Sequence, residues 1–349
     1  MGERRDTPRR PWSSAGRVGT LGCREGAIIL SLPDPYAIIS GEFRTEAISY
    51  LPFPQNRDSL ALLGGALPPL VLNGIIRHDS HGLLMDGVSF KHVDQYAMCC
   101  IEHLSDELKV ALRENLTRIC HGVDQASRDR ALYKYPATLR AFWDRYSGKT
   151  RKTQVGMLGE LLSHVVILKL FPGFDVVSPF FNMEEKSIRK GFDLLLYESS
   201  SNEVWITEVK SGGMRVGKTP CTATRDLLAK ARDDLKGRLA EQEMNHWQNA
   251  INAARNSIHA KADFRESVLE ILELEGDLAV GKSATAADNN VFLISALFSD
   301  VSQRVAEKTI SKFTTDLAKG AVFKTLVVLS LHKGTLKRLE DFLRTESGH

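Results

Sequence analysis

The sequence predicts an α/β protein in which a mixed central sheet is flanked by helices. Two observations support this fold class. The 349 residues are 43% hydrophobic and 26% charged, a balance typical of globular proteins that bury a core. From residue 154 onward, apolar residues recur alternately at helical spacing and in short runs typical of strands. The resulting order of elements is α-β-β-β-α-α-β-α-β-α.

The first helix of this series is expected at residues 154–171. Its apolar residues recur at helical spacing, and Pro172 with Gly173 ends the run. Three strands should follow, at residues 174–181, 192–198 and 204–209. The last two strands are joined by residues 199–202 and therefore form a hairpin. The helical residues that carry the prediction are Leu158, Leu161, Leu162 and Val165.

Helices are expected after the hairpin. One is predicted at residues 222–245, and a second helical stretch covers residues 247–275. Strands are then predicted at residues 291–297 and 323–331, with a helix between them at residues 301–319 that ends before Gly320. A last helix should begin near residue 335. The apolar stripe of the first of these helices consists of Leu228, Ala231, Leu235 and Leu239.

The chain is expected to have three parts. A flexible basic leader is predicted at residues 1–20, an N-terminal α+β accessory domain at 21–150, and the main α/β domain at 151–349. In the accessory domain, residues 27–32 have the pattern of a strand. Residues 105–120 have that of a helix with Ser105 as N-cap. The polar stretch at residues 147–150 is expected to be a hinge.

Composition excludes several classes of protein. A formal net charge of +3 excludes a histone-like or tail-driven nucleic-acid binder but permits a local basic groove. No apolar run reaches the roughly 20 residues that span a bilayer, and the basic N-terminus lacks the apolar segment of a signal peptide. We therefore expect a cytoplasmic protein without a membrane segment. The five cysteines are expected to be reduced thiols, and their spacing does not favour a zinc site.

The predicted hairpin gathers charged residues on one patch of sheet. A four-residue loop sets Glu198 opposite Glu203, and counting inward then sets Asp193 opposite Glu208. Lys210 lies two residues beyond Glu208 and shares its face. A slip of one residue would separate the two carboxylates, so the prediction depends on register.

Two opposed carboxylates in an apolar sheet repel each other and lose hydration, which must be offset. A divalent cation does this, and hard oxygen ligands suit Mg²⁺, with Mn²⁺ as an alternative. Asp193, Glu208 and the carbonyl of Val209 would hold the ion. Lys210 would orient a water or stabilise a pentavalent phosphorane. The competing interpretation is a salt bridge on a solvated edge.

These residues resemble the split signature of the PD-(D/E)XK nuclease superfamily. Asp193 is followed fifteen residues later by Glu208-Val209-Lys210, and Glu160 on the upstream helix is similar to the acidic residue that many members carry there. Phe192 precedes Asp193 where the strict signature has proline. The resemblance covers about residues 154–236. It implies a restriction-endonuclease-like core of αβββαβ order, with catalytic Asp193, Glu208, Lys210 and Glu160, and Glu160 as a further metal ligand.

Within that superfamily, the layout is similar to the nuclease subunit of Hachiman anti-phage defence systems. This resemblance implies a Mg²⁺-dependent endodeoxyribonuclease that hydrolyses phosphodiester bonds of DNA. It also implies a helicase partner and activity that is restrained until infection. Four basic residues after the signature are expected to contact phosphate: Arg215, Lys218, Arg225 and Lys230.

Two other functions remain open. Residues 212–219 fit the Walker A pattern of P-loop ATPases, between a predicted strand and a helix, and Asp300 could serve as the second acidic residue of such a site. The same pattern recurs at residues 276–283 in a helical context, which shows its low specificity. The remaining alternative is a catalytically inactive interaction module that keeps the nuclease fold.

Overall fold

The computed structural model describes residues 83–180, 191–240, 244–334 and 336–349. By its internal contacts the chain divides into Met1–Pro69 and Leu70–His349, and every described residue belongs to the second unit. The predicted leader at residues 1–20 and the strand at residues 27–32 lie outside the described residues. The second unit is therefore described by itself.

The described residues form one mixed sheet of eight strands, in the order β1-β2-β3-β8-β7-β6-β5-β4. The pairs β3-β8, β8-β7 and β7-β6 are parallel, and the outer pairs are antiparallel. The predicted mixed sheet is thus confirmed. The strands are β1 (Leu83–Met85), β2 (Val88–Val93), β3 (Tyr96–Ile101), β4 (Phe174–Val176), β5 (Leu194–Glu198), β6 (Glu203–Gly213), β7 (Asn290–Phe298) and β8 (Thr325–Lys333).

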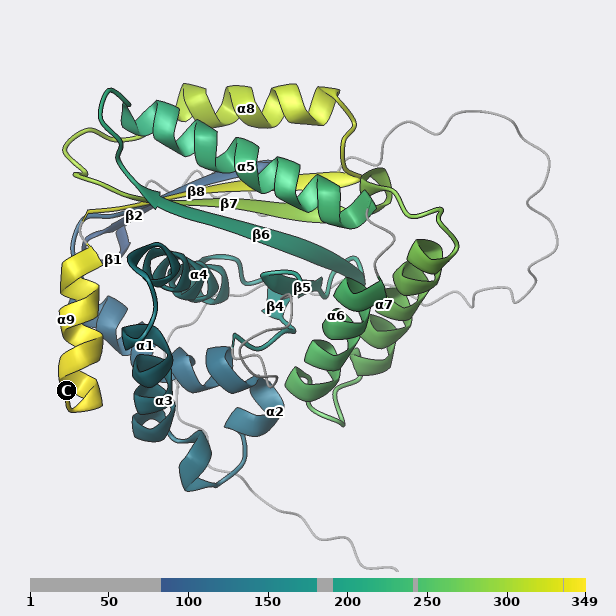
Figure 1. The fold of residues 1–349 in the computed structure, drawn as a ribbon, viewed down its shortest axis with the longest axis horizontal. Helices are drawn as coiled ribbons and strands as arrows, with labels where there is room; N and C mark the ends of the chain where they lie inside the picture. Colours follow the sequence, from purple (N-terminus) through teal and green to yellow (C-terminus); the bar gives the residue numbers. More distant parts are fainter. Residues whose placement is uncertain (1–82, 181–190, 241–243, 335) are drawn as a thin grey trace, which may run out of the picture. The chain divides into compact units, whose positions relative to one another are not determined.

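Helices cover both faces of the sheet (Figure 1). One core holds the helices α1, α3, α4 and α9 against one face, and a second core holds α5 to α8 against the other. The long helices are α1 (Asp106–His121), α3 (Tyr135–Ser147), α4 (Arg151–Leu170), α5 (Pro220–Ala240), α6 (Met244–Ser257), α7 (Arg265–Val280), α8 (Glu307–Lys319) and α9 (Leu336–Ser347). Short turns of helix are α2 (Val123–Ala126), η1 (Ala131–Tyr133) and η2 (Ala286–Asp288).

Side chains alternate between the two cores along β6. Trp205 and Val209 belong to the core that contains α4, whereas Val204 and Ile206 belong to the core that contains α5. This period of two is what a strand buried on both faces requires. Residues 208 and 210 therefore face the α5 side of the sheet, and residue 211 faces α4.

Several predicted elements are confirmed, with local differences. Ser105 caps α1, since its Oγ accepts a hydrogen bond from the Leu108 N–H at 3.2 Å. The stretch predicted as one helix at residues 247–275 is two helices, because the chain turns between Ser257 and Arg265. The helix predicted from residue 301 begins only at Glu307.

The boundary expected at residue 150 falls inside the second unit. Strand β3 pairs with β8 along its whole length, from Tyr96 with Val328 to Ile101 with Lys333. Helices α1 and α3 share a core with α4. Residues 83–147 are thus a part of the main domain in this structure. Long-range pairing of this kind leaves no local signature in the sequence, because it depends on a strand more than 200 residues away.

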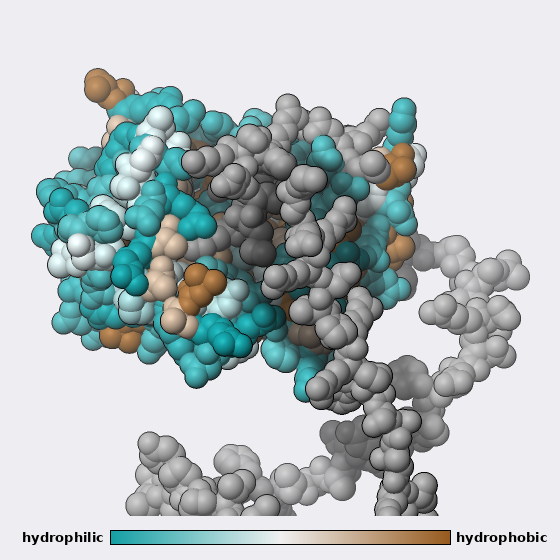
Figure 2. Space-filling model, turned by 60° about the horizontal axis from the view of Figure 1, so that its bottom comes forward, coloured by the Kyte–Doolittle hydropathy of each residue, from teal (hydrophilic) through white to brown (hydrophobic). Residues whose placement is uncertain are grey.

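Helix α4 packs against β4, β6 and β7. It is the one described helix whose length and composition would allow it to cross a membrane, but 61% of its most apolar window is buried inside the protein. On the face turned forward in Figure 2, the surface that grey atoms leave visible is mainly hydrophilic, with hydrophobic residues in small separate spots. Burial of α4 against the sheet accounts for its apolar composition.

The close packing of α4 on the sheet gives a stability prediction. A Cβ atom at Gly159 would lie 2.7 Å from the Ser211 Cβ and 3.0 Å from the Ala296 Cβ, whereas one at Gly156 would meet nothing within 4 Å. Gly159→Ala should therefore lower the free energy of unfolding by about 1–3 kcal/mol, through overpacking. Gly156→Ala, the matched control, should raise it by about 0.5–1 kcal/mol through helix propensity. Urea unfolding measures both, and equal effects would contradict this packing.

A buried lysine gives a prediction about pH. Lys333, at the end of β8, is 1% exposed, and burial, with a smaller contribution from Arg338, lowers its pKa to about 8. Because this pKa lies below its value of 10.5 in the unfolded chain, stability is lost as the pH falls from about 10.5 to about 8 and stays at the lower level below that. Lys333→Met should therefore be stabilising at neutral pH, by roughly 2–3 kcal/mol. The gain should vanish towards about pH 10.5, and a gain that does not change with pH would contradict the assignment.

Candidate functional site

The site begins with the register of the β5–β6 hairpin. Glu198 lies opposite Glu203, as predicted, and the pairing continues inward to Leu194 opposite Thr207. The Glu198 carboxylate accepts hydrogen bonds from Trp205 Nε1 at 3.1 Å and from Ser201 Oγ at 2.8 Å. Asn202 adopts a φ of 56° in the loop, a left-handed conformation that asparagine tolerates well. These contacts hold the hairpin in one register.

That register brings Asp193, Glu208 and Lys210 together. Asp193 precedes β5, and its Oδ2 accepts a hydrogen bond at 2.9 Å from the backbone N–H of Val209 on β6. Glu208 is fully buried, and its Oε1 is in contact with the Lys210 ammonium. Two carboxylates and one ammonium therefore share a single patch on the α5 face of the sheet.

Helix α5 adds two residues that were not predicted to meet the carboxylates. The Lys210 Nζ also forms an ion pair with Asp234, at 2.9 Å. The Arg238 guanidinium contacts Glu208 Oε2 and donates a hydrogen bond to the Gly191 carbonyl at 3.2 Å. Asp234 and Arg238 are four residues apart, so they lie on one flank of α5. The sequence shows that the two residues share a flank, but it does not show that this flank faces the hairpin.

Burial dominates the electrostatics of the pair. Burial and, to a smaller extent, the charge of Asp193 raise the pKa of Glu208 to about 7, against the opposing effect of Arg238 and Lys210. Burial lowers the pKa of Lys210, but the neighbouring carboxylates outweigh it, so the net shift is upward and the ammonium stays charged. Glu208 Oε2 forms an ion pair with Arg238, but the geometry of this contact is not that of a hydrogen bond.

Glu160 comes from the other side of the sheet. It is half-buried on α4, whose neighbouring residues Leu158 and Leu161 belong to the core opposite α5. Among the described residues, no three His, Cys, Asp or Glu side chains are arranged to hold a metal ion. The structure thus brings together Asp193, Glu208 and Lys210 of the predicted set, with Val209 beside them, whereas Glu160 stands on the helix that covers the other face of the sheet.

The four predicted phosphate contacts lie in different places. Arg215 and Lys218 are exposed on the loop between β6 and α5, and Lys218 forms an ion pair with Asp226 at 3.0 Å. Arg225 and Lys230 are exposed on α5. The Walker A pattern does lie between a strand and a helix, but α5 begins at Pro220, after its lysine and threonine. Asp300, the predicted second acidic residue, instead accepts hydrogen bonds from the Ser302 N–H and hydroxyl.

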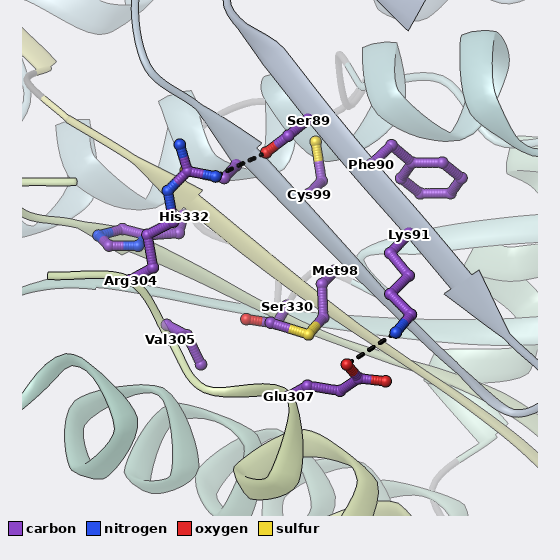
Figure 3. Close-up of a pocket in the computed structure, with 11 residues that line it drawn as sticks. Ser89, Phe90, Lys91, Met98, Cys99, Arg304, Val305, Glu307, Ser330 and His332 are labelled. Carbon is purple, nitrogen blue, oxygen red and sulfur yellow. Dashed lines mark hydrogen bonds and ion pairs between the residues drawn. The ribbon is translucent and has the colours of Figure 1, made fainter. Parts of the chain in front are cut away.

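A separate cavity of about 250 Å³ lies between β2, β3, β8 and the segment before α8, on the other side of β7 from β6 (Figure 3). Lys91 forms an ion pair with Glu307 at 2.7 Å, and Arg304 contacts Glu102 and donates to Ser89 Oγ at 3.4 Å. Both basic side chains of this cavity are thus paired within the protein. The four cysteines among the described residues form no disulfide.

The model of the HamA family matches residues 81–343, well over half of the chain. The chain belongs to the HamA family. HamA is a component of Hachiman anti-phage defence, so the predicted involvement in that defence is confirmed at the level of the family. None of the curated proteins compared with this HamA-family chain matches it. The matched range begins two residues before β1 and includes all eight strands, which agrees with a single domain from β1 to α9.

The contact between Arg238 and Glu208 gives a prediction for this HamA-family protein. A guanidinium against the carboxylate competes with any other cation that the carboxylate binds. Arg238→Gln should therefore tighten binding of Mn²⁺ several-fold at about pH 8.5, above the pKa of Glu208. Isothermal titration calorimetry measures it. Arg232→Gln, which removes an ion pair with Asp233 on the same helix, is the matched control. Weaker binding by Arg238→Gln would show that the guanidinium supports the cation.

Proposed function

We propose that this chain is the metal-dependent nuclease of a Hachiman system and that it hydrolyses phosphodiester bonds of DNA at Asp193, Glu208 and Lys210. The observation that carries the proposal is the convergence of these three side chains on one patch of the β5–β6 hairpin. Family membership supports the setting, since HamA belongs to an anti-phage defence. A PD-(D/E)XK-type core is part of the same proposal.

The donor set fits a hard divalent cation. Glu208 is fully buried, and its Oε2 has no hydrogen bond. Asp193 lies close enough to raise the pKa of Glu208 by its charge. Carboxylate oxygens are hard ligands, so Asp193 and Glu208 would hold Mg²⁺ or Mn²⁺, with the Val209 carbonyl as a further candidate. When bound, the ion would supply Lewis-acid activation of the scissile phosphate and of a water.

The chain's own residues then have distinct roles. Lys210 is held by Glu208 and Asp234, so its ammonium has a defined position beside the carboxylates. From there it would orient the attacking water or stabilise charge on the phosphorane. The Arg238 guanidinium contacts Glu208 and can form a bidentate pair with a phosphate once it leaves this carboxylate. Arg215 and Lys218 on the exposed loop would contact the DNA backbone.

A helicase partner is proposed on the same basis. Phosphate contacts by arginine and lysine carry no sequence information, so choice of substrate must come from elsewhere. The family belongs to a multi-component defence, which provides a setting with partner proteins. A helicase that opens duplex DNA in the cytoplasm would deliver strands to the carboxylate patch.

The decisive experiment is cleavage by substituted chains in the presence of the partner and Mg²⁺. Lys210→Ala and Glu208→Gln should each lower the rate of DNA cleavage by about a hundredfold or more, because each removes a group that acts on the reacting phosphate. Lys324→Ala is the matched control, since it breaks an ion pair with Glu203 at the other end of β6. It should leave cleavage unchanged, and thermal unfolding would show that all variants fold.

Other outcomes would favour the alternatives. Lys218→Ala should only weaken DNA binding, because Lys218 lies on the loop outside the carboxylate patch. ATP hydrolysis that is lost in Lys218→Ala would instead establish the P-loop function. Absence of cleavage with every divalent metal, with the partner present, would establish an inactive interaction module.

A further inference from the structure

The two helices on the outer side of the sheet enclose a groove. Helices α5 and α8 lie side by side over β6, β7 and β8 (Figure 1), and a groove of about 870 Å³ runs between them. Its floor is apolar, from Ala229 on α5 to Phe313, Leu317 and Val322 on the α8 side. The groove lies on the flank of α5 opposite to Asp234 and Arg238. It is thus separate from the carboxylate patch.

The walls of the groove are charged, and their charges do not cancel. Five basic and three acidic side chains line it. Each acidic residue already has a cation: Asp233 pairs with Arg232 at 2.7 Å, Asp316 with Lys312 at 2.8 Å, and Asp226 with Lys218 at 3.0 Å. Within the described part of the chain, the three remaining cations form no ion pair. They are Arg225, Lys236 and Lys308, and all are exposed.

These features favour a helix of a partner protein over nucleic acid. An apolar floor between charged walls fits an amphipathic helix whose aliphatic face enters the groove. Separate carboxylates on such a helix can be placed opposite Arg225, Lys236 and Lys308. A phosphate backbone carries charge along its whole length and would also be brought close to the carboxylates of Asp226, Asp233 and Asp316. The separation of residues 225 and 236 along α5 corresponds to about 16 Å, or three turns of helix.

We propose that the α5–α8 groove is the docking site for an acidic amphipathic helix of a partner protein. The occupant carries leucine-type side chains on one face and aspartate or glutamate beside them. Membership of a multi-component defence family supplies the setting for such a partner. The proposal is independent of nuclease activity, because it rests on a surface that shares no residue with Asp193, Glu208 or Lys210.

The test uses a synthetic peptide as probe and the full chain as receptor. A fluorescent helical peptide of about 14 residues, with leucines on one face and glutamates beside them, should bind in the micromolar range by anisotropy. The triple variant Arg225→Glu, Lys236→Glu, Lys308→Glu should weaken binding at least about tenfold. The matched control Lys149→Glu, Lys152→Glu, Lys261→Glu makes the same change in net charge at exposed positions away from the groove and should bind like the wild type.

Two further arms make the result decisive. Phe313→Ala leaves the charge unchanged and should also weaken the peptide, because it removes part of the apolar floor. A peptide of the same composition with its leucines scrambled around the helix should bind poorly. Equal binding of the scrambled peptide would overturn the proposal. So would a single-stranded oligonucleotide that binds the wild type and is lost in the triple variant, while the helical peptide does not bind.

Discussion

The register of the β5–β6 hairpin is the constraint on which the candidate site depends. Because side chains alternate along a strand, a slip of one residue would turn Glu208 toward α4 and leave Asp193 on the opposite face. Glu198 opposes that slip, because it is a buried carboxylate that accepts hydrogen bonds from Trp205 and Ser201. Another pairing would leave this buried charge without its hydrogen-bond donors. The placement of the candidate site residues is thus decided at the turn, ten residues or fewer from each of them.

Helix α5 completes the site from a different layer. Its buried stripe, with Leu228, Ala231 and Leu235, packs against the sheet and so determines which flank meets the hairpin. Once that stripe is in place, Asp234 reaches Lys210 and Arg238 reaches Glu208. The buried carboxylate is then matched by two cations in the chain itself. This explains how a fully buried glutamate beside Asp193 is tolerated in the fold.

The sequence predicted what depends on local spacing. The hairpin, its register and the α4 helix follow from periodicity and turn length, and they are found as predicted, with α4 starting three residues earlier. The sequence did not reveal that Asp234 and Arg238 join the site. Helical spacing shows that they share a flank, but it does not show what that flank faces. Nor could it tell that Glu160 stands on the helix that covers the opposite face. Which face a helix covers is decided by the crossover between strands, and the union of β3 with β8 is equally non-local.

The flank of α5 that meets the hairpin and the flank that lines the groove belong to one continuous helix of 21 residues. A movement of the whole helix that lifts Arg238 from Glu208 would also change the width of the groove between α5 and α8. If the groove binds a partner helix and the carboxylates bind an ion, this shared movement would link the two binding events reciprocally. A ligand that moves α5 away from the hairpin would raise the affinity of the carboxylates for a cation. A cation that displaces the Arg238 guanidinium would change the affinity of the groove for that ligand by the same factor.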